Sequence, residues 1–368
     1  MKLRNNRRIN PFHSKLLLTL IIIIASSYQI PLFSQETLSV GRSYRSLAMG
    51  NTGVASANDS AALYYNPAIL ANITGWWLDY AAYTVEASTG FSTLESAPML
   101  AYPIFPYINR EGINNLLKET FLSKDNPYLR ASAGINLSIN ISERGWTIAG
   151  SQMYESVMTT IDDGATIYQR DDMVEKIGLS IPIGLGQLVL GITGNRITRR
   201  VAADATTDTI PDWGGRYSGT GYDIGLLYRM ANQARITLGF VAQNYGGITL
   251  GDSGMVEEQT MAFGMSTNHE FGIFKLTVAA DIREIGSTAA KTNTLHAGAE
   301  LGIFPNSTGG SYLTYRTGFN QGYFTQGVEI NLFNHYLIVG YTQYSEEVGT
   351  GTEKVESQRA IAYLSLGL

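Results

Sequence analysis

The sequence predicts an all-β protein, an antiparallel transmembrane β-barrel of about 14 strands with an N-terminal hatch that plugs the lumen. Three observations carry this prediction: period-2 alternation along most of the chain, an export signal at its start, and connections of alternating length. The segment from Gly134 to Ser142 shows the alternation most clearly, because apolar and small polar residues alternate throughout it. Such alternation gives a strand one apolar and one polar face.

Similar alternating segments recur along the chain, at residues 177–183, 188–195, 222–229, 236–243, 274–283, 295–301 and 328–332. In several of them the polar face carries charge, as Lys275, Asp281 and Arg283 do in one strand. A soluble sandwich would bury its apolar face in a dry core. A membrane barrel turns that face to lipid and collects charge in its lumen, where opposite charges can pair across strands. The charged faces therefore favour the barrel.

The N-terminus predicts export. Five basic residues precede an apolar run from Leu16 to Ile24, which is too short to span a bilayer and suits a secretory signal peptide. Cleavage after Ser34 gives a signal peptide of residues 1–34, with 25–27 as an alternative cleavage site. Its removal changes the net charge from −5 to about −10, which disfavours binding to nucleic acid. The absence of cysteine excludes disulfides and thiolate metal sites.

The lengths of the connections indicate the direction and number of the strands. Tight turns such as 143–145 and 185–187 alternate with longer connections such as 203–215, as periplasmic turns and outer loops do in bacterial barrels. Counting back from the last strand, with 76–86 as the first, gives about 14 strands. The barrel is therefore expected over residues 75–368, with a long outer insertion at 87–128. Apolar residues at helical spacing predict an external helix at 112–124.

Residues 35–74 precede the first strand and lack its alternation. Asn58, Asp59 and Ser60 are good N-caps for a short apolar helix that Pro67 would stop. A segment of this size is too short to be a domain. It is well sized to be a hatch inside the barrel.

These residues resemble the FadL superfamily of outer-membrane barrels, which includes long-chain fatty-acid transporters and PorV-like secretion proteins. The resemblance is carried by Ala48-Met49-Gly50, by residues 58–62 and by Leu63-Tyr64-Tyr65-Asn66-Pro67-Ala68 just before the first strand. It implies a hatch whose motif is Asn66, Pro67 and Ala68. The sequence departs from the pattern at Asn51 and Ile69, where glycines are common, and at Leu368, where an aromatic signal for the barrel assembly machinery is usual.

The hatch motif has two interpretations. Asn66 and Pro67 could stop a helix while the asparagine bonds its own backbone. Alternatively, Asn66, Pro67 and Ala68 pack the hatch against the barrel wall and fix a gate, as the resemblance implies.

A fatty-acid transporter needs an apolar pocket with one or two bases to meet a carboxylate. The candidates are Arg42 and Arg45 in the hatch and Arg229 and Arg283 on the wall. Inward charges of this kind can equally pair with one another across strands.

The third strand, 146–160, does not keep a regular alternation of apolar and polar residues. If its outward-facing positions are continued along the strand, they include Gln152, which would then face lipid. A bulge or inward kink at Gly150, Ser151 and Gln152 would repair the phase. The resemblance implies a lateral gate at this kink. The alternative is a local bulge without function.

The sequence does not predict an enzyme. Residues Gly251 to Gly254 have the same sequence as a motif of serine proteases. However, the serine of this motif and two of the histidines, His269 and His335, are expected at opposite ends of the barrel. No two histidines have metal-ligand spacing, and neither a metal nor a cofactor is expected.

The resemblance thus implies an outer-membrane channel for uptake of hydrophobic small molecules, with long-chain fatty acids as the first candidate. Its expected partners are the ligand, outer-membrane lipid and the barrel assembly machinery, and not nucleic acid. The alternative is a PorV-like secretion accessory, or a structural barrel, that binds protein cargo. The expected helix at 112–124 favours this second interpretation.

Overall fold

The structure is a computed structural model. It describes residues 40–59, 61–73, 75–89, 127–142, 145–161, 166–184, 186–205, 214–231, 233–287, 294–306, 310–334, 336–350 and 353–367. The signal peptide 1–34, residues 90–126 of the insertion and the expected helix at 112–124 lie outside these residues. In the described part of the chain, no helix has the length and apolar character needed to cross a membrane.

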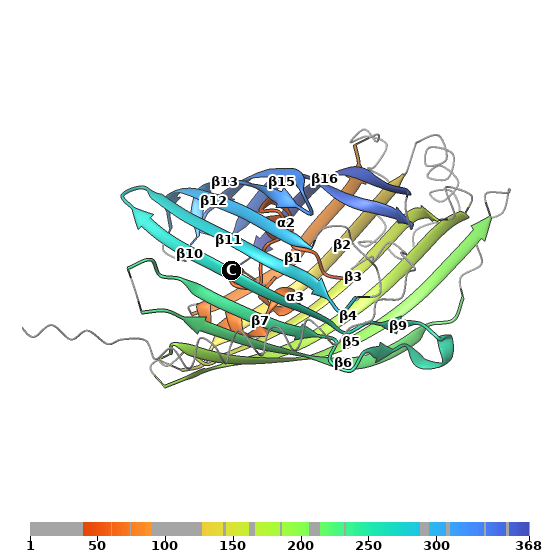
Figure 1. Cartoon of the computed structure of the whole chain (residues 1–368), viewed down its shortest axis with the longest axis horizontal. Helices are drawn as coiled ribbons and strands as arrows, with labels where there is room; N and C mark the ends of the chain where they lie inside the picture. Colours follow the sequence, from red (N-terminus) through yellow and green to blue (C-terminus); the bar gives the residue numbers. More distant parts are fainter. Residues whose placement is uncertain are drawn as a thin grey trace, which may run out of the picture.

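Fourteen antiparallel strands close into a barrel within the described residues (Figure 1). The first strand, β1 (Trp76–Ser88), pairs with the last, β16 (Glu353–Gly367), and closes the ring. The others are β2 (Tyr128–Asn140), β3 (Thr147–Ile161), β4 (Thr166–Ile183), β5 (Leu188–Ala205), β6 (Tyr217–Arg229), β7 (Thr237–Gln243), β10 (Thr260–Phe271), β11 (Phe274–Ile285), β12 (Leu295–Pro305), β13 (Ser311–Asn320), β14 (Tyr323–Leu332) and β15 (Leu337–Thr350). The predicted all-β barrel of about 14 strands is confirmed.

The two ends of the barrel differ. We call the end at which β1 begins the turn end and the opposite end the loop end. At the turn end, β10 continues to Phe271 and the chain reverses at Gly272, whose φ is 62°. The alternation of lengths is not strict, since only Gln321 and Gly322 join β13 to β14 at the loop end.

The outer face of the barrel is apolar. Along β6, exposed Tyr222, Ile224, Leu226 and Tyr228 alternate with buried residues. Exposed aromatic side chains also gather near the turn end, namely Trp76, Trp146, Phe271, Phe304, Phe333 and Tyr336. A closed sheet with an apolar outer face, a polar lumen and an aromatic rim is the architecture of lipid-embedded barrels.

The expected bulge at Gly150, Ser151 and Gln152 is absent. Strand β3 pairs with β4 along its whole length and with β2 from Thr147 to Thr159, in both cases without a shift of register. Gln152 does face outward, and its cross-strand neighbour Glu175 pairs on the outer surface with Arg196 at 3.6 Å. A regular strand thus carries this polar side chain outward, beside an ion pair of the neighbouring strands.

Register shifts occur elsewhere. In β1 the pairing slips beside Tyr80, between Asp79 and the residues that follow. A second shift separates Met261 from Phe263 where β10 meets β11. Sequence phase alone placed the irregularity on the wrong strand.

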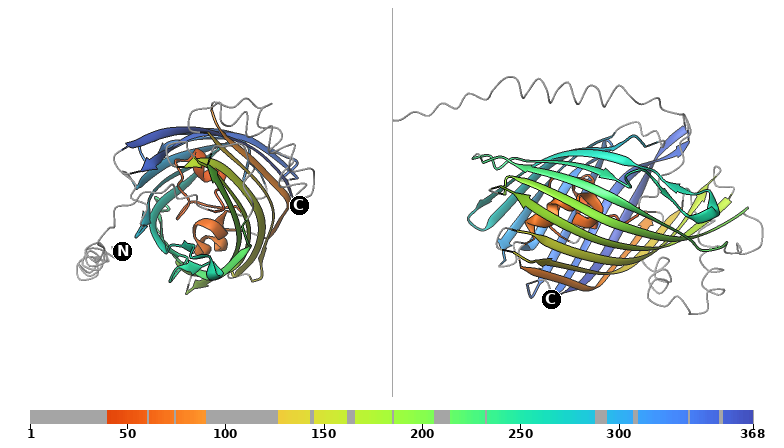
Figure 2. Two further views of the ribbon diagram at one scale, coloured as in Figure 1. Left: turned by 90° about the vertical axis from the view of Figure 1, so that its right-hand side faces the viewer. Right: turned by 90° about the horizontal axis from the view of Figure 1, so that it is seen from below.

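Residues 40–59 and 61–73, which precede β1, lie inside the barrel, as the ring view in Figure 2 shows. This lumenal segment, residues 40–73, contains α2 (Tyr44–Ala48), α3 (Ala62–Tyr65) and the 3₁₀ helix η1 (Pro67–Asn72). Helix α2 contacts β13 to β15, and η1 contacts β3 to β6. Helix α3 ends at Tyr65, because the residue before a proline is held extended, as Asn66 is. Pro67 then begins η1, whose first position does not need the amide that proline lacks. Asp59 caps the turn before α3 by accepting from the amide of Ala61 at 3.1 Å.

A short ribbon between β7 and β10 was not predicted. It consists of β8 (Ile248–Thr249), η2 (Gly251–Ser253) and β9 (Val256–Glu257). The ribbon folds onto the inner face of β6, where Gly219 and Gly221 leave room for Ile248. Side chains of the ribbon thereby enter the lumen.

Candidate functional site: the lumen

Glycines let the barrel wall receive the lumenal segment. On eight strands an inward glycine faces that segment, and an added Cβ would lie within 2.8 Å of one of its atoms. These residues form the glycine girdle: Gly178, Gly191, Gly225, Gly239, Gly264, Gly298, Gly318 and Gly327. Several contacts are backbone to backbone, such as the 2.1 Å between a Cβ built on Gly191 and the amide nitrogen of Ala68. The segment is therefore packed directly against the strands, at a distance that only glycine allows.

The motif Asn66-Pro67-Ala68 lies against this girdle. The Asn66 Oδ1 accepts from the amide of Ala68 at 3.0 Å and so caps η1. Its Nδ2 donates to the carbonyl of Val54 at 2.8 Å, and to Leu226 of the wall at 3.4 Å. Both interpretations of the motif thus describe part of its geometry, since it caps a helix and also contacts the wall. Its role in a gate stays a prediction.

A carboxylate on β11 holds the turn after α2. Asp281 accepts from the amides of Gly53 and Val54 at 2.7 and 2.9 Å. Beside it, Arg283 donates to the carbonyl and to the side chain of Asn51, each at 2.8 Å. Asn51 has a φ of 65°, in the left-handed region that asparagine tolerates best after glycine. This conformation accounts for an asparagine at a position where the sequence pattern led us to expect glycine.

The four candidate arginines do not meet in one pocket. Arg42 donates to both carboxylate oxygens of Glu346, at 2.5 and 2.9 Å, and Arg45 holds Glu300 at 2.7 and 3.0 Å. Arg229 lies at the turn end, where it donates to the carbonyl of Gly186 and the side chain of Asn72. Arg283 binds Asn51, as described above. Each arginine therefore has a partner within the chain, and a role for any of them in ligand binding stays a prediction.

A row of buried ion pairs crosses the lumen near the loop end. Its side chains are at most 7% exposed, apart from Glu257 at 19%. In order of contact this ionic belt consists of Arg42, Glu346, Arg359, Glu86, Arg130, Glu155, Arg170, Asp172, Arg199 and Glu257. Charges alternate along it, so each interior charge has an opposite neighbour, as buried ions require.

Below the ionic belt lies an apolar layer. Val174 on β4, Ile197 on β5, and Ile248 and Leu250 of the ribbon pack together and are at most 4% exposed. Met153, Tyr64, Val40, Tyr217 and Met255 pack around them. One inward position further toward the turn end, Lys176 and Asp223 pair at 2.9 Å. The apolar layer is therefore enclosed between two charged levels of the lumen.

Sequence reasoning missed this layer because the ribbon that completes it was taken for an outer loop. The alternation of Ile248, Thr249 and Leu250, together with glycines at the facing positions 219 and 221, was the available signal. The string at 251–254 is the turn of this ribbon. Its Ser253 hydroxyl donates to the carbonyl of Leu250 at 2.6 Å.

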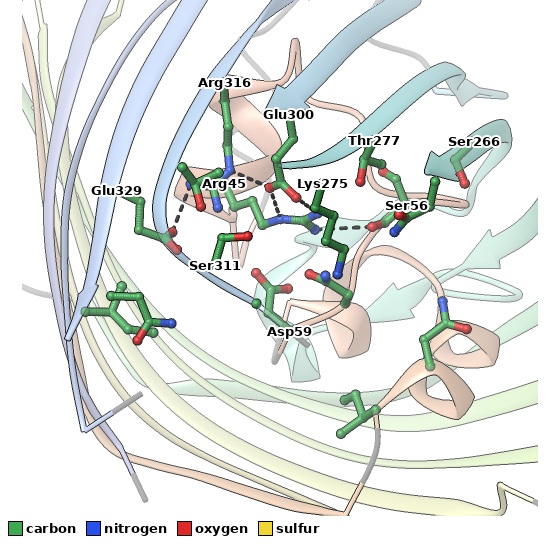
Figure 3. Close-up of a pocket in the computed structure, with 18 of the residues that line it drawn as sticks. Arg45, Ser56, Asp59, Ser266, Lys275, Thr277, Glu300, Ser311, Arg316 and Glu329 are labelled. Atoms are coloured by element: carbon green, nitrogen blue, oxygen red, sulfur yellow. Dashed lines mark hydrogen bonds and ion pairs between the residues drawn. The ribbon is translucent and has the colours of Figure 1, made fainter. Parts of the chain in front are cut away.

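Toward the turn end, the lumen contains a polar chamber of about 420 Å³ (Figure 3). Arg45 and Arg316 converge on Glu300, and Arg316 also pairs with Glu329 at 2.9 Å. Asp59 of the lumenal segment lines the same chamber. Burial raises the pKa of Asp59, and the positive charges of Arg45 and Arg316 oppose this rise.

No family model matches the chain, and no curated protein matches it. Among solved structures, the toluene transporter TbuX of Ralstonia pickettii is similar, with a TM-score of 0.55 and 12% identity over 89% of this chain and 99% of that one. The P. putida toluene transporter TodX has a TM-score of 0.53 and 11% identity, covering 89% of this chain and 98% of its own. The CymD monoaromatic hydrocarbon channel has the same score and identity, covering 90% and 98%. The chain thus has the fold of these three proteins.

Proposed function

We propose that this protein is an outer-membrane channel for the uptake of hydrophobic small molecules, which bind first in the apolar layer of the lumen. The observation that carries the proposal is that layer itself, an apolar site enclosed within a charged interior. A water-filled pore has no use for buried aliphatic side chains at this depth, whereas a hydrophobic ligand gains from each apolar surface that it covers. The fold shared with hydrocarbon transporters supports the proposal.

The ribbon is the cover of this site. Ile248 and Leu250 occupy the apolar layer, while Glu257 holds the ribbon to Arg199 of β5. A hydrophobic molecule that displaces Ile248 and Leu250 finds Val174 and Ile197 beneath them. Passage beyond this point requires the lumenal segment to move, because Tyr64 forms the floor of the layer and bonds Ser151 of the wall at 2.7 Å.

The chemistry around the layer favours an uncharged ligand over a fatty acid. The nearest bases of the ionic belt are Arg170 and Arg199, and both already hold carboxylates. A fatty-acid headgroup would have to compete with Asp172, which is fully buried. Long-chain fatty acids, the first candidate from the sequence, are therefore one arm of the test and not the assumed substrate.

The test is binding to the purified protein in detergent micelles. Ile197→Asn should weaken binding of the neutral fluorophore N-phenyl-1-naphthylamine by roughly tenfold, because it places an amide in the apolar layer. Thr198→Asn is the matched control, since Thr198 is the next residue on β5 and faces outward. Equal affinity in both variants would contradict the proposed site. A fluorescent fatty acid, tested in parallel, separates the two classes of ligand.

The secretion-accessory alternative depends on the segment 112–124, which lies outside the described residues, and it stays a prediction. The outer-membrane location and recognition by the barrel assembly machinery belong to the proposal. Fractionation of cells that express the full chain tests both, because a failure of assembly leaves the chain outside the outer-membrane fraction.

A further inference from the structure

The outer surface over β10 to β13 is hollowed by a trough of about 580 Å³. Small side chains and exposed backbone make its floor, chiefly Ala280, Ala297, Ala299 and Thr317. Met265, Val278 and Phe319 line it as well, and these three side chains are 43–54% exposed. We call this depression the outer trough. It lies on the apolar face of the barrel, on the opposite side of the wall from the lumen.

Two ridges of large side chains bound the outer trough. Toward the loop end, Phe263, Ile282 and Leu295 stand side by side on adjacent strands. Toward the turn end, Leu276, Leu301 and Tyr315 do the same. The rows between these ridges contain the alanines. With about 4.8 Å between neighbouring strands, the trough extends roughly 14 Å from β10 to β13.

Apart from Thr317, whose hydroxyl donates to the carbonyl of Thr325 at 3.2 Å, the outward polar side chains of the trough lie at one edge. Thr267 and His269 of β10 lie on its turn-end side, where the Thr267 hydroxyl bonds the His269 Nε2 at 2.9 Å and also donates to the carbonyl of Ala234. The remaining large side chains of the lining are apolar. An apolar trough with a polar edge is complementary to an amphiphile, and not to a wholly apolar molecule.

We propose that the outer trough binds one acyl chain of a membrane phospholipid, with the headgroup beside Thr267 and His269. The trough is continuous with the apolar outer face that lipid tails cover in a transmembrane barrel. Its volume falls within the range of roughly 300–1,000 Å³ typical of small-molecule sites.

The inner side of the same wall gives the lipid a structural role. Gly298 and Gly318 lie on β12 and β13, directly behind the alanines, and contact Met49 and Gly50 of the lumenal segment. The wall therefore has almost no side-chain thickness here. A bound acyl chain packs one face of these strands while the lumenal segment packs the other.

The experiment uses the full-length protein in phosphatidylethanolamine vesicles that contain a phosphatidylethanolamine with a diazirine on one acyl chain. After irradiation, adducts should concentrate on peptides of β11 to β13. Ala280→Phe with Ala299→Phe fills the trough and should reduce these adducts by roughly tenfold. Ala362→Phe is the matched control, because Ala362 is an exposed alanine of β16 between Val85 and Tyr341. It should leave the yield unchanged.

Three outcomes would overturn the proposal. Adducts spread evenly around the barrel, and unchanged by filling the trough, would mean annular lipid only. Displacement of the lipid by a saturating neutral hydrocarbon, with unchanged affinity at the apolar layer, would assign the trough to transported cargo. If the double variant fails to insert, Ala299→Leu alone replaces it, and unchanged adducts in that variant would count against the trough. None of these results bears on the binding of hydrophobic ligands at Ile197.

Discussion

Two stretches of the barrel wall hold the interior in different ways. From β15 through the β1–β16 seam to β5, the wall carries the ionic belt, whose side chains bind mostly to one another. From β6 to β14 the wall carries most of the glycine girdle and touches the lumenal segment through backbone. The ionic stretch therefore fills its own loop-end part, whereas nearer the turn end η1 packs against it. The glycine stretch depends on the lumenal segment for most of its filling.

The largest expected effect comes from closing a space in the glycine girdle. Gly191→Val should displace the lumenal segment, because the added Cβ would lie 2.1 Å from the Ala68 nitrogen and neither backbone can yield. Ion conductance in planar bilayers should rise strongly, while the barrel stays resistant to heat in gels. Gly194→Val is the control, since Gly194 is on the same strand and meets only the Ile177 carbonyl at 4.0 Å. Low conductance in both variants would mean that the girdle does not hold the segment.

The next effect comes from the ionic belt. Glu155→Gln removes a fully buried charge that Arg130 and Arg170 share, and breaking such a pair costs about 3–5 kcal/mol. Urea unfolding in micelles should show a lower free energy of unfolding by about that amount. Glu175→Gln provides the comparison, because Glu175 and its partner Arg196 are 35% and 58% exposed, and such pairs contribute about 0–1 kcal/mol. Similar losses in both variants would refute the distinction between belt and surface pair.

A smaller, local effect is expected at Asp281. Asp281→Ala leaves the amides of Gly53 and Val54 without their acceptor, at about 1–3 kcal/mol for each buried group. Hydrogen exchange at residues 51–55 should accelerate, whereas exchange in the strands should not. Asp281→Asn keeps an acceptor oxygen and should restore part of the protection. Unchanged exchange in the alanine variant would mean that the turn is held by packing alone.

Replacing the candidate arginines of the wall sharpens the comparison further. Arg283→Gln should loosen the segment near Asn51, and Arg229→Gln should do so less, because Arg229 lies in a more exposed contact at the turn end. The readout is protease sensitivity of residues 40–73 in micelles. If either change instead weakens fatty-acid binding by roughly tenfold, the carboxylate interpretation of that arginine is correct.

The smallest expected effect is a pH dependence at Asp59. Burial raises the pKa of this carboxyl in the folded protein above its unfolded value, so the folded state binds the proton more tightly. Stability should therefore decrease as pH rises from the unfolded pKa through the raised folded one, and then level off. Asp59→Asn should remove this decrease in unfolding experiments between pH 3 and 8. An identical pH profile in the variant would show that Asp59 contributes nothing to it.

The strands were predictable because their signal is local. Alternation in segments such as 222–229 and 274–283 identifies a strand and shows which of its faces points outward. Turns that contain glycine separate these segments. The strand count followed from the order of connections. Within the strands, glycines such as Gly225 and Gly264 occur on the polar, inward phase. They were a readable sign that something would pack against the wall there.

The contents of the lumen were not predictable in the same way. Pairing between Arg42 and Glu346, or between Arg45 and Glu300, joins residues more than 250 positions apart, and no local pattern encodes it. The bulge predicted at Gly150, Ser151 and Gln152 was wrong, because β3 keeps its register and carries Gln152 outward beside the pair of Glu175 and Arg196, which the pattern within β3 does not indicate. The ribbon was missed because an inward fold and an outer loop have the same composition.

The glycine girdle also constrains the order of assembly. The lumenal segment precedes β1 in the chain, and the ring closes only when β1 pairs with β16, the last strand to be made. At several girdle glycines the backbone of the segment is so close to the strand that not even a methyl group would fit between them. A helical segment could therefore not slide into a barrel that is already closed. We therefore expect the strands to pair around the segment during biogenesis, so that the segment serves as a template for the closing barrel. On this view, deletion of residues 40–73 would slow the closing of the β1–β16 seam.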